Sequence, residues 1–595
     1  MITNKIIYTV MSELFYSSER NIQIVIALLK ANGIKKIVAS PGATNFSFVG
    51  SLQQDPWFEM YSSVDERSAA YIACGLAAES GEPVVLTCTG STASRNYFPG
   101  LTEAYYRKLP VLAITSHQGK DRLGQLIFQN IDRSNPPHDA VKLSIELPVV
   151  KDERDEAYVT MQANKAILEL RRNGGGPVHI NMFTTYSREF PVKELPPVRV
   201  MKRIQAWDAM PEMPKGNICV YVGSHVHFTP EQTEAVDRFC ATHDAVVICD
   251  HTSGYYGKYH LLPTLSQLQK ATTLFETFDL MIHIGEVSAA TFAGTVPVKE
   301  IWRVSEDGEL RDPFKKLTTV FQMSELSFFK HYSSDKGNKH DNIDRYTTLF
   351  AEIYNHIPEL PFSNIWTASQ LSKRLPKGSL FHISASNSRR CWNMFHLPEG
   401  VQCTSNVGCC GIDGCTSTMI GSSLASPNRL CYLVTGDLAF FYDLNSLGNR
   451  HIGNNIRIIL INNAIGAEFK LTPHFCYKFG ETADPYMAAA GHFGAKSPVL
   501  VKHYCEDLGF QYLSARNKEE FMTALDTFTN PEITEKPMIL EVFTTHENEN
   551  EALKLMSTIT FEAKAALQSK VASTIRSVAG EKGINIIKGL MGKKK

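Results

Sequence analysis

Short apolar runs alternate with amphipathic stretches along most of the chain. In the first part the runs that predict strands are 34–40, 60–64, 83–88, 111–116 and 176–182. Amphipathic stretches at 21–31, 68–78 and 101–107 predict helices between them. Strands that recur every 20–30 residues, with helices between them, indicate a parallel sheet covered on both faces.

The same alternation returns twice further along the chain. Strands are predicted at 218–222, 245–249 and 280–284, with a helix at 230–242, and again at 380–383, 430–434, 456–461 and 538–543. Polar segments at 193–200 and 331–345 predict linkers. The expected fold class is α/β, with three consecutive parallel-sheet domains and a helical extension. The expected bounds are 1–192, 200–335 and 360–548 for the domains and 549–595 for the basic extension.

Composition narrows the class of protein. The chain has 60 basic and 61 acidic side chains, a net charge of −1, which argues against nucleic acid as the main partner. No segment approaches about 18 uninterrupted apolar residues, so no membrane-spanning helix is expected. The N-terminal segment lacks the layout of a secretory signal. The 13 cysteines contain no CxxC pair, which indicates reduced thiols in a cytoplasmic protein.

The most informative segment is 436–463. One predicted strand runs into Gly436 and Asp437, and the next ends at Asn462 and Asn463. Parallel strands that end at the same sheet edge can bring Asp437 and Asn463 together, at the edge where α/β sheets bind ligands. A carboxylate with an amide oxygen suits Mg²⁺, which also takes phosphate oxygens. The alternative is an ordinary turn Asp and a loop Asn.

Three other features are weak signals individually. Glu66 follows a strand and enters a helix, where an acidic residue is ordinarily a dipole or capping partner. Small-residue turns at 40–42 and 89–92 lie between a strand and a helix, where backbone N–H groups can receive an anion. The glycine-rich segment 408–414 allows close approach of the backbone to a ligand, although in isolation an ordinary tight turn is the better explanation.

Taken together these segments resemble the thiamine-diphosphate-dependent decarboxylase and carboligase superfamily. Within it, the chain resembles the family of the 2-succinyl-5-enolpyruvyl-6-hydroxy-3-cyclohexene-1-carboxylate synthases of menaquinone biosynthesis, up to about Met556. The motifs that carry the resemblance are DERSAAYIACGLA at 65–77, GPVHINM at 176–182, WRVSEDGELRDP at 302–313, GIDGCTST at 411–418 and GDLAFFYDLNSL at 436–447. The GDL of the last motif, where most relatives carry GDG, is specific to this family.

The resemblance implies a set of cofactor residues. Glu66 would hydrogen-bond the aminopyrimidine ring, while Asp437, Asn463 and the backbone carbonyl of Ile465 would ligate Mg²⁺. Ile412 would support the bent cofactor. Further residues that the resemblance places at the cofactor are Thr92, Asn406, Gly411, Asp413 and Gly436. It also implies a homodimer or tetramer, in which Glu66 of one subunit meets Asp437 of the other. The middle domain lacks a convincing GxGxxG, so FAD is not expected.

The residues expected at the substrate depart from the family pattern. The first turn carries Thr44 where the family has an Arg suited to a carboxylate, and Thr cannot replace the bidentate bonds of a guanidinium. Arg389 or Arg390 could substitute, or could be a solvated pair. Gln129 resembles a Gln near the reacting carbon of acetohydroxyacid synthases, or is a loop residue. His117 is a candidate proton donor, with a structural histidine as the alternative.

The resemblance implies an enzyme that decarboxylates a 2-oxo acid with thiamine diphosphate and transfers the acyl unit to an acceptor. The altered first turn favours a relative with a different acceptor over a menaquinone-pathway synthase. Alternatives are an acetohydroxyacid-synthase-like carboligase, a simple 2-oxo acid decarboxylase, and a catalytically silent paralogue that acts as a scaffold. The basic tail 561–595 could contact a membrane surface, although a helix covering a neighbouring subunit or a loose tail is favoured.

Overall fold

The computed structural model describes residues 15–269, 274–288, 295–492 and 495–559. It divides into two compact units. The first comprises residues up to Ala209 together with Asp307–Gln322, and the second comprises Met210–Glu306 and the chain from Met323 onward.

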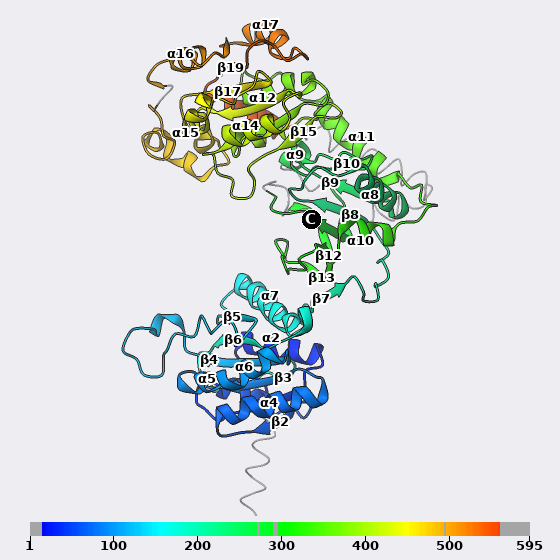
Figure 1. Ribbon diagram of the computed structural model, residues 1–595, viewed down its shortest axis with the longest axis vertical. Helices are drawn as coiled ribbons and strands as arrows, with labels where there is room; N and C mark the ends of the chain where they lie inside the picture. Colours follow the sequence, from blue (N-terminus) through cyan, green and yellow to red (C-terminus); the bar gives the residue numbers. More distant parts are fainter. Residues whose placement is uncertain (1–14, 270–273, 289–294, 493–494, 560–595) are drawn as a thin grey trace, which may run out of the picture. The chain divides into compact units, whose positions relative to one another are not determined.

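The first unit contains a six-stranded sheet in which every pair is parallel (Figure 1). In spatial order its strands are β2 (Glu59–Ser62), β1 (Lys36–Ala39), β3 (Val84–Cys88), β4 (Val111–His117), β6 (Val178–Phe183) and β5 (Leu143–Leu147). The chain leaves β1 toward β2 and leaves the neighbouring strand β3 toward β4, in opposite directions, so the sheet has its topological switch point between β1 and β3.

Helices cover both faces of this sheet. The helices of one face are α2 (Arg20–Ala31), α3 (Phe46–Gln53) and α7 (Glu153–Glu169), and those of the other are α4 (Glu66–Ser80), α5 (Thr92–Asn96) and α6 (Phe98–Tyr106). Successive strand residues point to opposite faces, so Val85 belongs to the core under α2 while Val84 and Leu86 belong to the core under α4. Strands buried on both sides explain the continuous apolar runs in the sequence.

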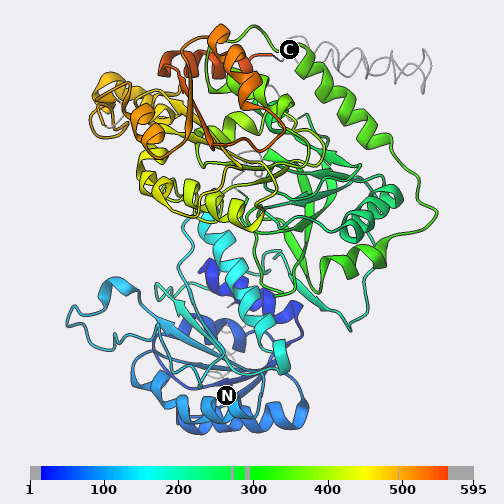
Figure 2. The same cartoon turned by 45° about the horizontal axis from the view of Figure 1, so that its top comes forward.

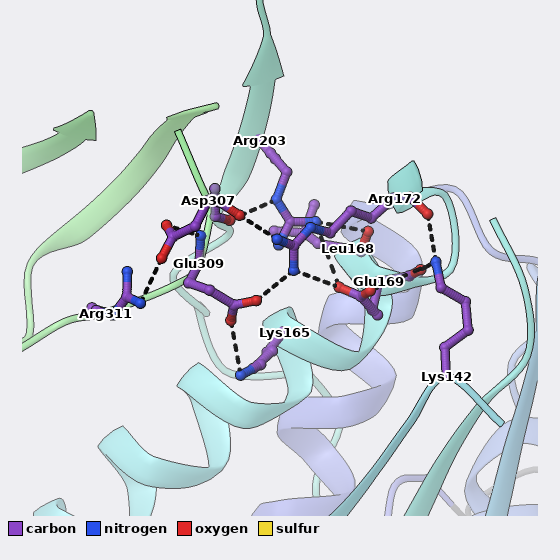
Figure 3. Close-up of polar contacts among 10 residues, drawn as sticks. Lys142, Lys165, Leu168, Glu169, Arg172, Arg203, Asp307, Glu309 and Arg311 are labelled. Carbon is purple, nitrogen blue, oxygen red and sulfur yellow. Dashed lines mark hydrogen bonds and ion pairs between the residues drawn. The ribbon is translucent and has the colours of Figure 1, made fainter. Parts of the chain in front are cut away.

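A charged cluster attaches the segment Asp307–Gln322 to the first unit (Figure 3). Arg172 lies 2.5 Å from Glu309 Oε1 and 3.4 Å from Glu169 Oε2, while Lys165 lies 3.1 Å from Glu309 Oε2. Arg203 donates to the carbonyl of Gly308 at 2.9 Å. The segment ends in β13 (Leu317–Gln322), which pairs in parallel with β7 (Lys202–Gln205). The motif at 302–313 therefore includes Glu309 as an anchoring residue.

The second unit begins with a parallel sheet of central strands. Their order is β10 (His260–Leu261), β9 (Val246–Ile248), β8 (Ile218–Val222), β11 (Phe278–Ile284) and β12 (Val298–Val304). The accompanying helices are α8 (Pro230–His243), α9 (Thr264–Leu268), α10 (Glu325–Tyr332) and α11 (Asp341–Asn355), the last visible in Figures 1 and 2.

The second unit also contains a third sheet, again six-stranded and parallel. Its order is β15 (Gln402–Thr404), β14 (Leu380–Ile383), β16 (Cys431–Gly436), β17 (Ile456–Asn462), β19 (Met538–Phe543) and β18 (Gln511–Ala515). Numbered within each domain, this is the same order as in the first unit. The two domains therefore share one topology that their sequences do not reveal as a repeat.

Helices pack on both faces of the third sheet. One core lies under α12 (Asn364–Leu371), α13 (Asn387–Trp392), α17 (Lys518–Phe528) and α18 (His546–Met556). The other lies under α14 (Cys415–Ala425), α15 (Asp437–Tyr442) and α16 (Leu500–Asp507).

The structure confirms the α/β class, with three parallel-strand sheets. The prediction of a linker at 331–345 is wrong, because these residues include the start of α11, whose Ile343 and Tyr346 are buried. Helix α18 crosses the expected boundary at 548, since Leu553 and Met556 belong to the core of the third sheet. The rest of the predicted basic extension, from residue 560, lies outside the described residues.

All 13 cysteines lie among the described residues and are unpaired, eleven of them buried. Within that part of the chain, no helix is both long and apolar enough to cross a membrane.

Candidate functional site

The candidate site lies at the carboxyl edge of the third sheet, beside its topological switch point. Strands β14 and β16 are neighbours there, and the chain leaves β16 at Gly436 to begin α15 at Asp437. Asn463 follows the adjacent strand β17, in which Ile461 pairs with Gly436. The parallel register therefore brings Asp437 and Asn463 to one place, as the sequence predicted.

A pocket with a volume of about 110 Å³ opens at this edge. Among its lining residues are Ser386, Ile412, Gly436, Asp437, Asn463, Ile465 and Glu468. Five of these residues were expected at the cofactor or metal from the sequence, and they come from three separate segments of the chain. We call this pocket the cofactor pocket for that reason. Ligands of open α/β sheets bind in this position.

Asp437 is buried and surrounded by backbone donors. Its Oδ1 accepts the N–H of Leu438 at 2.7 Å, and the N–H groups of 463–465 also stabilise its charge. Burial outweighs these donors and raises the pKa of Asp437 to about 6. A bound cation would compensate the charge that burial disfavours, which fits a metal ligand.

Asn463 supplies the second oxygen. Its Oδ1 is buried and has no hydrogen-bond partner in the part of the chain that the structure describes. Such an oxygen costs free energy unless something binds it. An unpaired amide oxygen beside a carboxylate and a backbone turn fits Mg²⁺, which takes one or two carboxylates and fills its shell with phosphate oxygens and water. Among the described residues, no group of three or more His, Cys, Asp and Glu side chains is placed to hold a metal ion.

The turn that carries Asn463 and Ile465 is held in an unusual conformation. Ala464 has φ of 61°, which is unfavourable for a residue with a Cβ. The Oδ1 of Asn462 accepts the N–H of Ala464 at 3.2 Å, and its Nδ2 donates to Glu541 at 2.7 Å. Glu541 was not predicted, because only the fold brings β19 beside β17.

Ser386 is a second lining residue that the sequence did not single out. It sits between β14 and α13 with φ of 68° and ψ of −129°, and it lies across the switch point from Asp437. Backbone strain of this kind is typical of functional turns. Its position in a turn between a strand and a helix is one typical of ligand-binding residues. Nothing in the sequence SASNS at 384–388 distinguishes Ser386 from the serines beside it.

The two candidate arginines have different surroundings. Arg390 Nη2 lies 2.6 Å from Glu468 Oε1, so its charge is compensated by a residue of the cofactor pocket. Arg389 lies near Asp250 of the central strands and favours the charged form of that buried carboxyl, although burial has the larger effect and raises the pKa of Asp250. Of the two arginines, Arg390 is therefore the one connected to the cofactor pocket, through its ion pair with Glu468.

The remaining expected cofactor residues of this unit lie around the start of α14. Ile412 is half-buried and lines the pocket, as required of an apolar support. Asn406 donates to Thr418 Oγ1 at 3.2 Å. Gly411 is half-buried and Asp413 is exposed, in the turn that precedes the helix.

In the first unit, Glu66 begins α4 at the carboxyl edge of its sheet. Asp65 caps the helix by accepting the N–H of Ser68 at 3.0 Å, which leaves the half-buried Glu66 carboxylate to receive Asn96 Nδ2 at 3.4 Å. Asp65, not Glu66, is therefore the capping residue. Thr92 is exposed at the start of α5, after Ser91 with φ of 62°.

Thr44 is buried within the first unit and its hydroxyl is occupied. It forms a hydrogen bond with Thr89 Oγ1 and accepts the N–H of Gly90 at 3.2 Å. These contacts tie the turn after β1 to the turn after β3. They give the Thr44 hydroxyl a structural role in this conformation.

His117 and Gln129 are placed very differently. The ring of His117 is buried, and its Nδ1 accepts the N–H of Gly119 at 2.8 Å. Burial, with a smaller effect from Arg133, lowers the pKa of His117 to about 4, so the neutral ring matches the structural alternative. Gln129 is exposed and has φ of 63°, beside the exposed apolar side chains of Leu126 and Phe128.

Comparison with known proteins agrees with this geometry. Residues 21–135 match the N-terminal TPP-binding domain of the thiamine pyrophosphate enzymes. This match, together with the relatives described next, defines the class as a thiamine-diphosphate-dependent enzyme.

A comparison over most of the chain gives a more specific relationship. It is 31% identical over 564 residues to the 2-succinyl-5-enolpyruvyl-6-hydroxy-3-cyclohexene-1-carboxylate synthase of Bacteroides thetaiotaomicron, covering 91% of this chain and 98% of the relative. The synthase of Phocaeicola vulgatus is 31% identical over 563 residues, with the same coverage of both chains, and that of Flavobacterium psychrophilum is 28% identical over 554 residues, covering 88% and 95%. The chain therefore belongs to the family of the 2-succinyl-5-enolpyruvyl-6-hydroxy-3-cyclohexene-1-carboxylate synthases.

Proposed function

We propose that this enzyme uses thiamine diphosphate and Mg²⁺ to decarboxylate a 2-oxo acid and transfers the acyl unit to an acceptor. The observation that carries the proposal is the buried pair of Asp437 and Asn463, whose free amide oxygen and buried carboxylate fit a hard cation. The cofactor supplies a thiazolium ring that accepts the electron pair released with CO₂.

The chain's own residues would then divide the work. Asp437, Asn463 and the carbonyl of Ile465 hold the metal and, through it, the diphosphate. Ile412 packs against the cofactor. Glu66 holds the aminopyrimidine by a hydrogen bond and controls its protonation, a role that needs a carboxylate which is not already used as a helix cap.

The proposal includes a homodimer, in which each active site takes Glu66 from one subunit and Asp437 from the other. The homodimer is supported by large apolar side chains that are exposed to solvent in the single chain. On and before α4, Val64, Tyr71 and Ile72 are 80%, 48% and 43% exposed. In the third domain, Tyr442 at the end of α15 is 66% exposed. Apolar side chains in such positions are typical of surfaces that a second subunit covers.

The acceptor differs, in this proposal, from that of a menaquinone-pathway synthase. Thr44 is occupied by internal hydrogen bonds, and Arg390 is neutralised by Glu468. Neither side chain is available to hold a substrate carboxylate as a free guanidinium would.

A substrate panel tests the proposal. Purified protein with Mg²⁺ and thiamine diphosphate is given a series of 2-oxo acids, with and without isochorismate, and CO₂ and products are measured. We expect CO₂ release with at least one 2-oxo acid and poor transfer to isochorismate. No CO₂ from any 2-oxo acid would contradict the proposed reaction, and efficient product from isochorismate and 2-oxoglutarate would contradict the altered acceptor. Condensation of pyruvate with itself would instead identify an acetohydroxyacid-synthase-like enzyme.

A further inference from the structure

A second pocket lies between the central strands and the third sheet, within the second unit. These two parts pack closely, since the N–H of His251 donates to Asn393 Oδ1 at 3.1 Å and Gln269 donates to the carbonyl of Met556 at 2.7 Å. The pocket between them has a volume of about 320 Å³, at the lower end of the range of pockets that hold small organic ligands. We call it the acceptor pocket.

Most of the acceptor pocket is apolar, with a few polar groups. Leu268, Met394 and Leu471 form much of its lining. Gln267 uses its Oε1 to accept the hydroxyl of Thr295 at 2.8 Å, and its Nε2 is buried without an acceptor among the described residues. An apolar wall with one unused amide donor is suited to a ring compound that carries an oxygen.

Arg390 connects the acceptor pocket to the cofactor pocket. Its side chain lines the acceptor pocket, while its partner Glu468 lines the cofactor pocket beside Asp437. The guanidinium and carboxylate are 26% and 22% exposed, so a ligand in either pocket can reach the pair. The two pockets therefore meet at this ion pair.

The charged side chains of this ion pair affect which ligands the acceptor pocket accepts, and His474, whose Nδ1 accepts the N–H of Cys476 at 3.1 Å, also lines the pocket. Glu468 Oε1 is 2.6 Å from Arg390 Nη2, and Arg390 Nη1 also donates to Asn387 Oδ1 at 3.3 Å. A carboxylate ligand would have to separate Arg390 from Glu468 and would then lie near a second negative charge, which is unfavourable at low solvent exposure. Glu468 Oε2 has no partner among the described residues, so it can accept a hydrogen from a hydroxyl or amide.

We propose that the acceptor pocket binds an uncharged, largely apolar ring compound bearing hydroxyl or amide groups, and that Glu468 excludes carboxylates by holding Arg390. That this ligand is the acyl acceptor rests on the proposed function. The binding preference itself follows from the pocket and the pair, and does not depend on that role.

Benzamide and benzoate test this preference, because they are nearly the same shape and differ in charge. Their dissociation constants are measured by ligand-observed NMR on the full chain. We expect benzamide to bind the wild type at least about tenfold more tightly than benzoate, and Glu468→Gln to shift the ratio toward benzoate by about tenfold or more. Glu399→Gln is the matched control, since Glu399 pairs with Lys377 on the exposed surface of the same domain. It is expected to behave as the wild type.

A second variant checks where the probes bind. Leu471→Trp fills the acceptor pocket and is expected to abolish benzamide binding, with the thermal unfolding midpoint confirming that the variant folds. Arg390→Met gives a further measurement should Glu468→Gln not fold, and it is expected to weaken benzoate without gaining the reversed ratio.

The proposal is overturned when neither probe binds, when benzamide binding survives Leu471→Trp, or when Glu468→Gln leaves the ratio unchanged. Release of CO₂ from 2-oxo acids without acceptor measures the proposed function separately. A protein that decarboxylates but binds both probes equally would contradict only the acceptor pocket.

Discussion

Asn462 Nδ2 donates a hydrogen bond of 2.7 Å to Glu541 Oε1, and this contact fixes the residue directly before the expected metal ligand Asn463. The opposite end of the same amide accepts the N–H of Ala464 at 3.2 Å. Glu541 thereby sets the orientation of a strained turn without lining the cofactor pocket, which makes it a positioning residue.

Glu541→Ala is expected to raise the apparent Kd for Mg²⁺ by about tenfold or more, because groups that orient metal ligands contribute that much to metal affinity. Titration of Mg²⁺ at saturating thiamine diphosphate, followed by calorimetry, measures the change. Tyr512→Phe is the control, since the Tyr512 hydroxyl binds the other carboxylate oxygen at 2.7 Å and its loss leaves the Asn462 contact in place. An unchanged Kd in Glu541→Ala would show that the turn at 462–465 keeps its conformation without the contact to Glu541.

Glu549 predicts a pH dependence of stability. It is fully buried and accepts the N–H of Asn364 at 2.9 Å and the hydroxyl of Thr544 at 2.7 Å, but burial dominates and raises its pKa to about 7. The folded state therefore retains a proton that the unfolded state loses near pH 4.5. The stability contribution is greatest below that pH and falls as pH rises through about 7.

Relative to Glu549→Gln, the wild-type free energy of unfolding is expected to decrease by about 2 kcal/mol between pH 5 and 8. Urea denaturation of both proteins at several pH values gives the difference directly, and the isosteric Gln removes the titrating group while keeping an acceptor oxygen. Parallel pH profiles for the two proteins would contradict the raised pKa.

Glu309 predicts the strength of the anchor for the segment Asp307–Gln322. In Glu309→Ala the guanidinium of Arg172, only 12% exposed, loses its shortest ion pair. We expect a loss of about 1–3 kcal/mol, less than for a fully buried pair because Glu309 is partly exposed. Glu231→Ala breaks the exposed pair with Lys330 and should cost about 0.5 kcal/mol or less. Equal losses in both variants would mean that the cluster in Figure 3 is no anchor.

Much of the fold could be predicted from the sequence because buried parallel strands are continuous apolar runs. The strands at Ile218–Val222, Leu380–Ile383 and Met538–Phe543 have the predicted bounds. The edge strands β5 and β18 were missed, because few of their side chains are buried and the apolar pattern is correspondingly weak. The first turn of helix α11 was included in a predicted linker because the sequence before and within it is strongly polar.

The candidate site was predictable where its residues follow strands. Asp437 and Asn463 end two consecutive strands, and pairing of those strands in parallel, which the structure shows for β16 and β17, brings them to the same sheet edge. Glu541 and Glu468 were not predictable, because each acts through a contact made only by the folded chain. The hydrogen bond that occupies the Thr44 hydroxyl was also not predictable, because Thr89, its partner, lies 45 residues away in the sequence.

The central claim is that a thiamine-diphosphate reaction depends on the Glu66 carboxylate, and Glu66→Gln tests it most directly. The measurement is the rate of CO₂ release from the best 2-oxo acid at saturating Mg²⁺ and thiamine diphosphate, with cofactor affinity measured on the same samples. Glu79→Gln is the control, an exposed carboxylate on the same helix α4. We predict a loss of at least about a hundredfold in Glu66→Gln with the cofactor still bound, and wild-type rates in Glu79→Gln. Unchanged turnover in Glu66→Gln would contradict the account.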